Sequence, residues 1–165
     1  VRLVLGDEHG HAMRRARDEA AGSIWVGADR FGQAAEARAL VPMMAAGRDG
    51  VVGRVLFSRS VSPLTEEDLA DLTMWAAQSG VELSEVAEEV LHGKFLLWDD
   101  DDVVITSLNW SSAGTRWDNP WGEIGVHIRL TGLAKTMRSQ VEASLQTAQA
   151  EKLAYLAERK HRRQG

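Results

Sequence analysis

Short apolar, β-branched runs alternate with Ala-, Glu- and Arg-rich stretches along this chain, and that alternation most constrains its fold. The apolar runs have the length of strands, and the stretches between them have the composition of helices. We therefore expect an α/β fold, with a mixed β-sheet flanked by helices on both faces. The expected strands are 1–5, 23–28, 51–58, 81–86, 91–98, 103–108 and 123–130, and the expected helices are 8–21, 33–46, 65–79 and 133–162.

Three residues add detail to these elements. Thr65, followed three residues later by Asp68, is typical of a capping box at a helix N-terminus. Pro42 falls inside the 33–46 stretch, where its ring kinks or splits a helix. Trp25 is expected to be buried, because a sheet covered on both faces leaves it no open side.

The length and composition predict one domain. A chain of 165 residues with 44% hydrophobic content buries one sizeable core, so we expect 1–165 to form a single domain. It begins with Val1 rather than Met, which suggests processing or, more readily, a domain cut from a longer protein. The absence of cysteine excludes disulfides and thiolate metal sites and is compatible with a cytoplasmic protein. No apolar run approaches the roughly 20 residues of a membrane span.

Charge and histidine content limit the choice of partners. The net charge of −5 argues against a uniformly basic nucleic-acid-binding surface. Two basic clusters suit either phosphate binding or solvated helix faces. His9 and His11 can share one face of a strand but have no third ligand nearby, so we expect neither a metal nor another cofactor. The clusters are Arg14, Arg15 and Arg17 near the start, and Lys152, Arg159, Lys160, Arg162 and Arg163 near the end.

The apolar runs 91–98 and 103–108 are separated by four consecutive acids, a pattern typical of a β-hairpin with the acids at the turn. Alternation along the first strand places His92 and Lys94 on one side, with Gly93 leaving room between them. On the partner strand, one face carries Ser107 and Asn109, and antiparallel pairing can bring that face alongside the first.

These four side chains suit a phosphoryl centre. A cation and an amide donor can hold charged oxygens while a neutral imidazole attacks phosphorus. Histidine suits this chemistry because one imidazole can act as the nucleophile while a second, protonated imidazole donates to the leaving group. Such a scheme requires no metal. Taken singly, each residue is better explained as an ordinary polar position on a strand or turn, but the combined spacing is not.

The combined spacing resembles the signature of the phospholipase D superfamily. The chain reads His92-x-Lys94, four residues, Asp99, six residues, and then Thr106-Ser107-x-Asn109. The departure is at Thr106, where the family has glycine; a β-branched residue is acceptable in a strand but can crowd the site. Asp99 belongs to the motif, but at the strand end we expect it to tie the turn together.

The resemblance implies a phospholipase D-like fold and a role for each matching residue. His92 would form a phosphohistidine intermediate, while Lys94 and Asn109 would bind phosphate oxygens. Ser107 would hydrogen-bond within the site. In the family a glutamate follows the Asn on the next strand; here Glu123, at looser spacing after Asn119, would orient His92 or set its tautomer.

Family enzymes build one active site from two such motifs, and this chain has one. His9-Gly10-His11 lacks the lysine, and His127-Ile128-Arg129 is followed by Ala134 where an acid is expected. The second half-site therefore comes from a symmetric homodimer, which we favour, or from another part of a longer polypeptide. Three tryptophans can build that interface or a substrate groove, in which Trp110 would contact the substrate, or they can pack in the core and rim. They are Trp110, Trp117 and Trp121.

The sequence thus predicts a metal-independent phosphodiesterase, most readily a nuclease acting on DNA, because small single-motif members of the family are often dimeric nucleases. Basic clusters and tryptophans can follow a DNA backbone and stack on bases. One alternative is a phospholipid hydrolase or transphosphatidylase, which uses the same chemistry. Another is a non-catalytic nucleic-acid-binding module of a larger DNA-processing or defence protein, which Thr106 and the spacing of Glu123 would favour.

Overall fold

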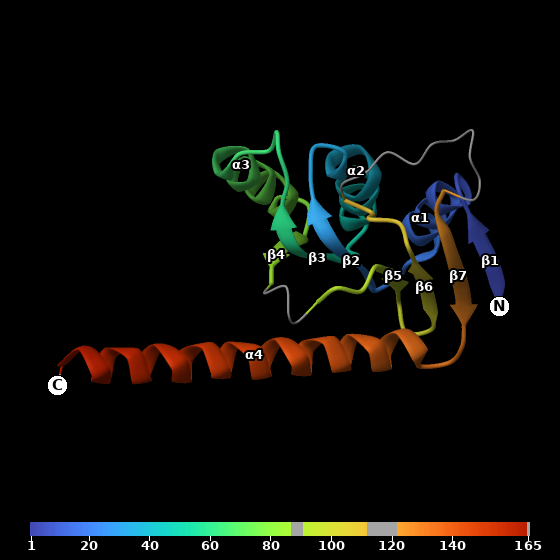
Figure 1. Ribbon diagram of the computed structural model, residues 1–165. Helices are drawn as coiled ribbons and strands as arrows, with labels where there is room; N and C mark the ends of the chain where they lie inside the picture. The colour runs from blue at the N-terminus through green and yellow to red at the C-terminus, as the bar shows by residue number, and fades with distance from the viewer. Residues whose placement is uncertain (87–90, 112–121, 165) are drawn as a thin grey trace.

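The computed structural model describes residues 1–86, 91–111 and 122–164, and its elements form three layers (Figure 1). Within these residues, seven strands form one mixed sheet. Helices lie on both of its faces, as the alternation of runs predicts. In chain order the elements are β1 (Arg2–Leu5), α1 (Glu8–Glu19), β2 (Ser23–Phe31), the π-helical turn η1 (Glu36–Leu40), α2 (Val41–Gly47), β3 (Val52–Ser60), α3 (Glu66–Ala77), β4 (Val81–Glu85), β5 (Phe95–Trp98), β6 (Asp102–Thr106), β7 (Ile124–Arg129) and α4 (Leu133–Gln164).

The strands lie in the order β1-β7-β6-β5-β2-β3-β4. β2, β3 and β4 are parallel, whereas β5, β6, β7 and β1 continue the sheet in antiparallel pairs. Gly27 faces Phe95, so the end of β2 lies beside the start of β5. Thr106 faces Gly125, so the end of β6 lies beside the start of β7. Four chain segments therefore meet at one end of the sheet, and the β5–β6 turn lies at the other.

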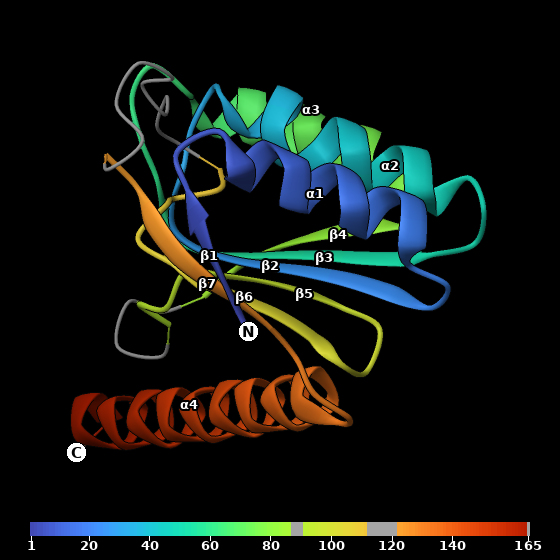
Figure 2. The same cartoon turned by 90° about the vertical axis from the view of Figure 1, so that its right-hand side faces the viewer.

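Within the described residues, two apolar cores lie between the layers that Figure 2 shows. α1, α2 and α3 cover one face, where Ile24 and Val26 of β2 belong to the larger core. Trp25 points to the opposite face and is buried, as predicted, with Arg54 stacked 5.0 Å from its ring. α4 covers this second core with side chains spaced four residues apart, as one helix face requires. They are Leu133, Met137, Val141 and Leu145.

The second half of α4 projects beyond the sheet (Figure 1). It carries exposed Leu153, Tyr155 and Leu156, together with the basic cluster at the end of the chain. No helix in the described part of the chain has the length and apolar character needed to cross a membrane.

Two helix predictions are confirmed in detail. Thr65 and Asp68 form the predicted capping box: the Thr65 hydroxyl accepts from the Asp68 N–H, and the Asp68 carboxylate accepts from the Thr65 N–H. The stretch expected as one helix divides into η1 and α2. Pro42 lies in the first turn of α2, where its missing N–H has no helical partner to lose.

The hairpin strands are shorter than predicted. β5 begins at Phe95, so His92 and Lys94 precede the strand rather than lie on it; likewise, Ser107 and Asn109 follow β6. The β2–β5 ladder stops at Gly27 because the next outward N–H, that of Asp29, donates to the Asn109 carboxamide instead. Beyond the strand ends, Lys94 and Ser107 are held by backbone hydrogen bonds, to the Thr106 N–H and the Ile124 carbonyl, and Asn109 is held by its side chain.

Candidate active site

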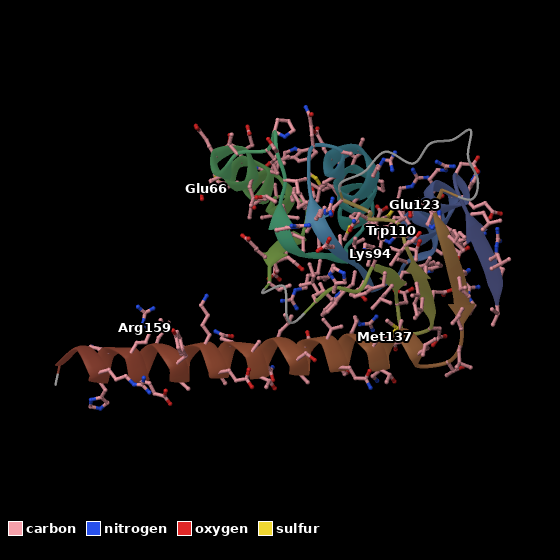
Figure 3. The ribbon with its side chains drawn as sticks, viewed as in Figure 1. Glu66, Lys94, Trp110, Glu123, Met137 and Arg159 are labelled. Carbon is pink, nitrogen blue, oxygen red and sulfur yellow. The ribbon has the colours of Figure 1, made fainter. Side chains whose placement is uncertain are left out.

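The motif residues other than Asp99 lie at the end of the sheet where β2 and β6 finish and where β5 and β7 begin. Figure 3 shows Lys94, Trp110 and Glu123 toward this end. His92 and Lys94 arrive just before β5, and Asn109 arrives just after β6. The hairpin thus brings together residues 17 positions apart in sequence, from 92 to 109.

His92 is held at the surface beside a buried carboxylate. Its side chain is 72% exposed, and its Nδ1 lies 3.6 Å from Oδ1 of Asp29, whose side chain is only 6% exposed. The chain leading into His92 is anchored by buried Ser58, whose hydroxyl donates to the Leu91 carbonyl at 2.5 Å. Asp29 is not among the site residues predicted from the sequence. The feature that could have indicated it is its position as a lone acid at the end of the apolar run Ile24–Ala28.

Asn109 is oriented by the end of β2. Its Oδ1 accepts a hydrogen bond from the Asp29 backbone N–H at 3.0 Å. Because a backbone N–H needs an acceptor, this contact assigns the oxygen and leaves the amide NH₂ as a donor. Lys94 is half-buried and forms no ion pair with any residue in the described ranges. A cation and an amide donor are therefore available for the oxygens of a phosphodiester.

Ser107 and Glu123 contact each other. The Ser107 hydroxyl donates to Glu123 Oε2 at 2.5 Å and accepts from the Ile124 N–H at 3.0 Å. Between Glu123 and His92, no hydrogen bond or ion pair is found among the residues that the structure describes. Strand order explains this, since Glu123 precedes β7 while β5 lies on the far side of β6, next to β2. The carboxylate beside His92 within the described residues is that of Asp29.

Thr106, which stands where the family has glycine, is accommodated by its neighbours. Its hydroxyl lies 2.6 Å from Nε2 of His9 on α1 and accepts from the Leu108 N–H at 3.0 Å. Opposite it on β7 is Gly125, where an added Cβ would come within 2.9 Å of the Thr106 Cβ. The extra volume of Thr106 is therefore compensated by a glycine on the adjacent strand.

Asp99 lies at the opposite end of the sheet, where the β5–β6 turn meets the start of β2. Its carboxylate accepts from the backbone N–H groups of Ala21, Gly22 and Ser23 at 3.0, 2.7 and 3.2 Å. Ser23 and Asp29 are six positions apart along β2, so Asp99 is roughly 20 Å from the His92 end. Its φ of 49° is a left-handed conformation that Asp tolerates better than most residues.

The pKa of the Asp99 carboxyl reflects these contacts. Burial alone would raise it, but the three backbone donors and the charge of Arg138 together hold it below its usual value. Arg138 on α4 also donates to the Asp99 carbonyl and to Asp100, at 2.7 Å for the latter. Asp99 therefore ties the hairpin turn to both β2 and α4.

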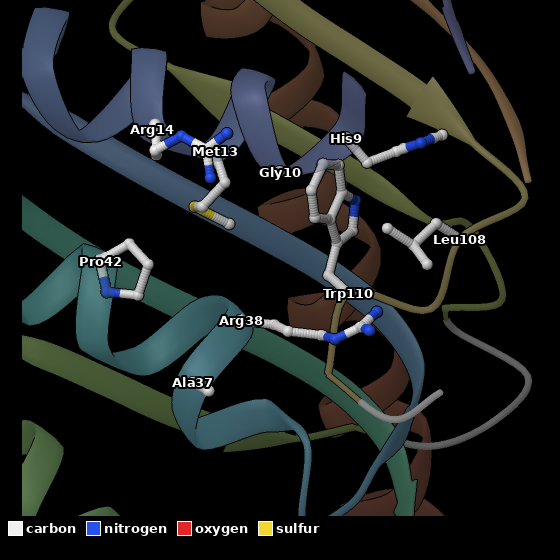
Figure 4. Close-up of a pocket in the computed structure, with 9 residues that line it drawn as sticks. All are labelled: His9, Gly10, Met13, Arg14, Ala37, Arg38, Pro42, Leu108 and Trp110. Atoms are coloured by element: carbon white, nitrogen blue, oxygen red, sulfur yellow. The ribbon is translucent and has the colours of Figure 1, made fainter. Parts of the chain in front are cut away.

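Trp110 belongs to the core rather than to an open groove. Its side chain is 2% exposed, and it packs edge-on against His9 with ring centroids 5.6 Å apart. It lines a cavity of about 220 Å³ between α1 and the η1–α2 segment (Figure 4). The other two tryptophans of interest, Trp117 and Trp121, lie outside the described residues, as do Asn119 and Pro120.

The remaining histidine segments have structural contacts. His9 and His11 lie on α1 rather than on a strand, because the helix begins at Glu8. His127 is buried on β7, donates from its Nε2–H to the Asp102 carboxylate at 2.8 Å, and stacks on Trp98. Among the described residues, no group of three or more His, Cys, Asp or Glu side chains is arranged to hold a metal ion.

Comparison with known proteins places this fold. The family model described as "Cardiolipin synthase, PLD-like domain" matches residues 13–145, most of the chain. The chain belongs to the phospholipase D-like family. The resemblance predicted from the motif is thereby confirmed, and so is the expected α/β class of the domain. No curated protein gives a significant match to this phospholipase D-like sequence.

Solved structures share the phospholipase D-like fold at low identity. The phospholipase D family member Nuc from Salmonella typhimurium is 19% identical with a TM-score of 0.64, over 87% of this chain and 91% of Nuc. NucT from Helicobacter pylori is 11% identical with a TM-score of 0.64, over 88% and 94%. The archaeal chromatin protein TrmBL2 is 17% identical with a TM-score of 0.58, over 86% of this chain but only 51% of TrmBL2.

Replacing Asp99 should lower stability. Asp99→Ala removes the acceptor of three backbone N–H groups and should reduce the free energy of unfolding by roughly 1.5–3 kcal/mol, the range for bonds to a charged group. Asp99→Asn keeps one acceptor oxygen and tolerates the positive φ, so it should lose less. Urea unfolding of both variants tests this, and equal stability of Asp99→Ala and the unmodified domain would contradict it.

His9 should make stability depend on pH. Burial lowers the pKa of His9. The hydrogen bond to the Gly6 carbonyl and the charges of Glu123 and Glu8 raise it, but by less. The unfolded chain therefore binds the proton first as pH falls below about 6.5. Stability should be lost between that pH and the lower folded pKa, by at most about 1.4 kcal/mol per pH unit.

The matched variant for this effect is His9→Gln, which keeps a polar side chain but cannot be protonated. Urea unfolding at pH 7.5 and pH 5.5 should show a smaller loss for His9→Gln than for the unmodified chain. Identical losses in the two proteins would assign the pH dependence to other groups.

Proposed function

We propose that this phospholipase D-like domain is a metal-independent phosphodiesterase that hydrolyses DNA through a phosphohistidine on His92. The supporting observation is the convergence of His92, Lys94 and Asn109 at one end of the sheet, with His92 exposed to a substrate. A nucleophile, a cation and an oriented amide donor together match the needs of phosphoryl transfer.

The reaction would proceed in two steps. Nε2 of His92 attacks phosphorus and forms a phosphorus–nitrogen bond, while the bond to the leaving oxygen breaks and that oxygen takes a proton from a second imidazolium. Water then attacks the phosphohistidine, giving its proton back to the second imidazole as the phosphorus–nitrogen bond breaks. Lys94 and the Asn109 NH₂ stabilise the charge on the non-bridging oxygens in both steps. Glu123, just before the neighbouring strand β7, accepts a hydrogen bond from Ser107 and would thereby support the segment that carries Asn109.

A second copy of this chain would supply the second imidazole. The sequence contains a single motif, and His92 stands at the surface with most of its ring uncovered. A twofold axis passing beside His92 would place two copies of the motif around one phosphate and make the interface isologous. His92 of one copy would then act as the nucleophile, and His92 of the other copy would act as the acid.

DNA is the substrate that the charge near His92 favours. Arg30 and Arg59 stand beside Asp29 with about half of each side chain exposed, next to the proposed phosphate position. The basic end of α4 adds a second positive surface. Guanidinium groups suit bidentate contacts with a phosphate backbone. TrmBL2, the chromatin protein of similar fold, is described as showing a novel mode of DNA binding.

Two other functions also have observations in their favour. The family model is described as a cardiolipin synthase domain, which favours phospholipid hydrolysis or transphosphatidylation by the same residues. Thr106 in place of the family glycine, together with the likeness to a chromatin protein, favours a non-catalytic nucleic-acid-binding module. Assays on DNA and on phospholipid separate all three.

His92→Ala should abolish activity. We expect the unmodified domain to cleave plasmid or single-stranded DNA in the presence of EDTA, and the variant to lose at least about 10³-fold in rate, because the nucleophile is gone. His11→Ala, which removes an exposed histidine of α1, is the matched control and should cleave normally. Residual cleavage in His92→Ala would contradict the proposal. Turnover of phosphatidylcholine without DNA cleavage would select the lipid alternative, and DNA binding without cleavage would select the non-catalytic one.

The shared site predicts that two His92 side chains lie close together across a dimer. The chain has no cysteine, so His92→Cys introduces a single thiol. A short bismaleimide should cross-link this variant into dimers, whereas His11→Cys should react without cross-linking. Sedimentation of the unmodified domain should give the mass of a dimer. A monomer in sedimentation, with no cross-link through position 92, would point to a different source for the second half-site.

A further inference from the structure

We infer that Asp29 is the positioning residue of His92, accepting a hydrogen bond from its Nδ1–H so that Nε2 presents a lone pair to the phosphate. The inference rests on the proposed function of His92 and gives the orienting role, expected for Glu123, to a residue on β2. The surroundings of the Asp29 carboxylate carry it.

The two carboxylate oxygens of Asp29 have different surroundings. Oδ2 lies 3.4 Å from Nε of Arg30 and 3.9 Å from Nη2 of Arg59. Oδ1 is buried and has no hydrogen-bond partner among the described residues. A buried carboxylate oxygen without a donor is costly, so a nearby N–H is expected to serve it.

The Nδ1 atom of His92 is placed to provide that N–H. It lies 3.6 Å from Asp29 Oδ1, a few tenths of an ångström beyond hydrogen-bonding distance. Catalytic hydrogen bonds are often long before substrate binds and shorten in the complex. Because the imidazole is 72% exposed, a small rotation toward Asp29 meets little packing resistance.

Asp29 itself is held firmly. It lies within β2, its side chain is 6% exposed, and its backbone N–H donates to Asn109 Oδ1. Asn109 would therefore have two roles, since its NH₂ faces the phosphate while its oxygen fixes the residue that orients the nucleophile. Within one chain, Glu123 has no such access, because its Oε2 is engaged by Ser107 and β6 separates β7 from β5.

The competing explanation is that Asp29 serves only as an ion-pair partner for Arg30 and Arg59. The two explanations differ in what happens to the His92 ring. If Asp29 accepts from Nδ1–H, its removal changes the tautomer of His92, because the hydrogen bond of one ring nitrogen decides which nitrogen carries the proton. If Asp29 only balances the arginines, the tautomer stays as it was.

The test compares Asp29→Asn with Glu123→Gln, which makes the same chemical change at the position that the motif had indicated. The ring nitrogens of His92 are observed by ¹⁵N NMR above neutral pH without substrate, and assigned by their absence in His92→Gln. We expect the Nδ1–H form in the unmodified domain and in Glu123→Gln. In Asp29→Asn, where the side-chain NH₂ can donate to Nδ1, we expect a shift toward the Nε2–H form.

Activity provides a second readout. Asp29→Asn should lower kcat for DNA cleavage by roughly 10²- to 10⁴-fold with little change in KM, the scale at which a wrong tautomer disables an imidazole in the serine-protease triad. Asp29→Glu keeps the charge and should retain the Nδ1–H form and more activity than Asp29→Asn. If Asp29→Asn does not fold, Asp29→Ser, which also removes the carboxylate, takes its place in the comparison with Glu123→Gln: a shift away from the Nδ1–H form in Asp29→Ser supports the inference, and an unchanged tautomer overturns it.

The outcomes separate the inference from the proposed function. An unchanged His92 tautomer in Asp29→Asn, or a changed one in Glu123→Gln alone, would overturn the inference even if the domain cleaves DNA. A tautomer that depends on Asp29 in a domain that cleaves no phosphodiester would support the contact while refuting the proposed function.

Discussion

The antiparallel addition of β5 to β2 is the constraint on which the rest of the structure depends. Phe95 sits directly over Gly27, where an added Cβ would come within 2.4 Å of the ring, so this pairing requires a residue without a side chain. At the other end of the same pair, the Asp99 carboxylate accepts from three successive N–H groups at the start of β2. Each contact fixes one end of the hairpin, and a shift by one residue would break both and invert the faces of β5.

That register decides which residues meet at the candidate site. Because β5 lies between β2 and β6, the segment that precedes β5 and the segment that follows β6 both lie near the end of β2. His92 and Asn109 therefore both contact Asp29, one through its carboxylate and the other through its backbone N–H. The site is built around the end of β2, a strand that carries no residue of the signature motif.

The sequence was a good guide to elements and a weaker guide to contacts. Apolar periodicity predicted the seven strands found in the described residues and the buried position of Trp25, because burial patterns depend on local alternation. It extended β5 back to Leu91, because apolar and motif residues there fit an alternating strand, whereas the ladder ends where Asn109 takes the Asp29 donor. The motif predicted which residues come together, but the carboxylate beside His92 depends on strand order, which spacing along the chain does not reveal.

Two acidic residues show that the residues of the motif and the residues at the candidate site are not the same. Asp99 is part of the signature, yet it lies roughly 20 Å away along β2 and stabilises the turn that sets the register. Asp29 is outside the signature, yet it is the buried carboxylate next to the exposed imidazole. A charge that is already satisfied by three N–H groups has little left to offer a substrate. In contrast, a buried oxygen of Asp29 has no donor among the described residues and lies 3.6 Å from the His92 Nδ1, so it can still accept a hydrogen bond, and the two acids differ in this respect.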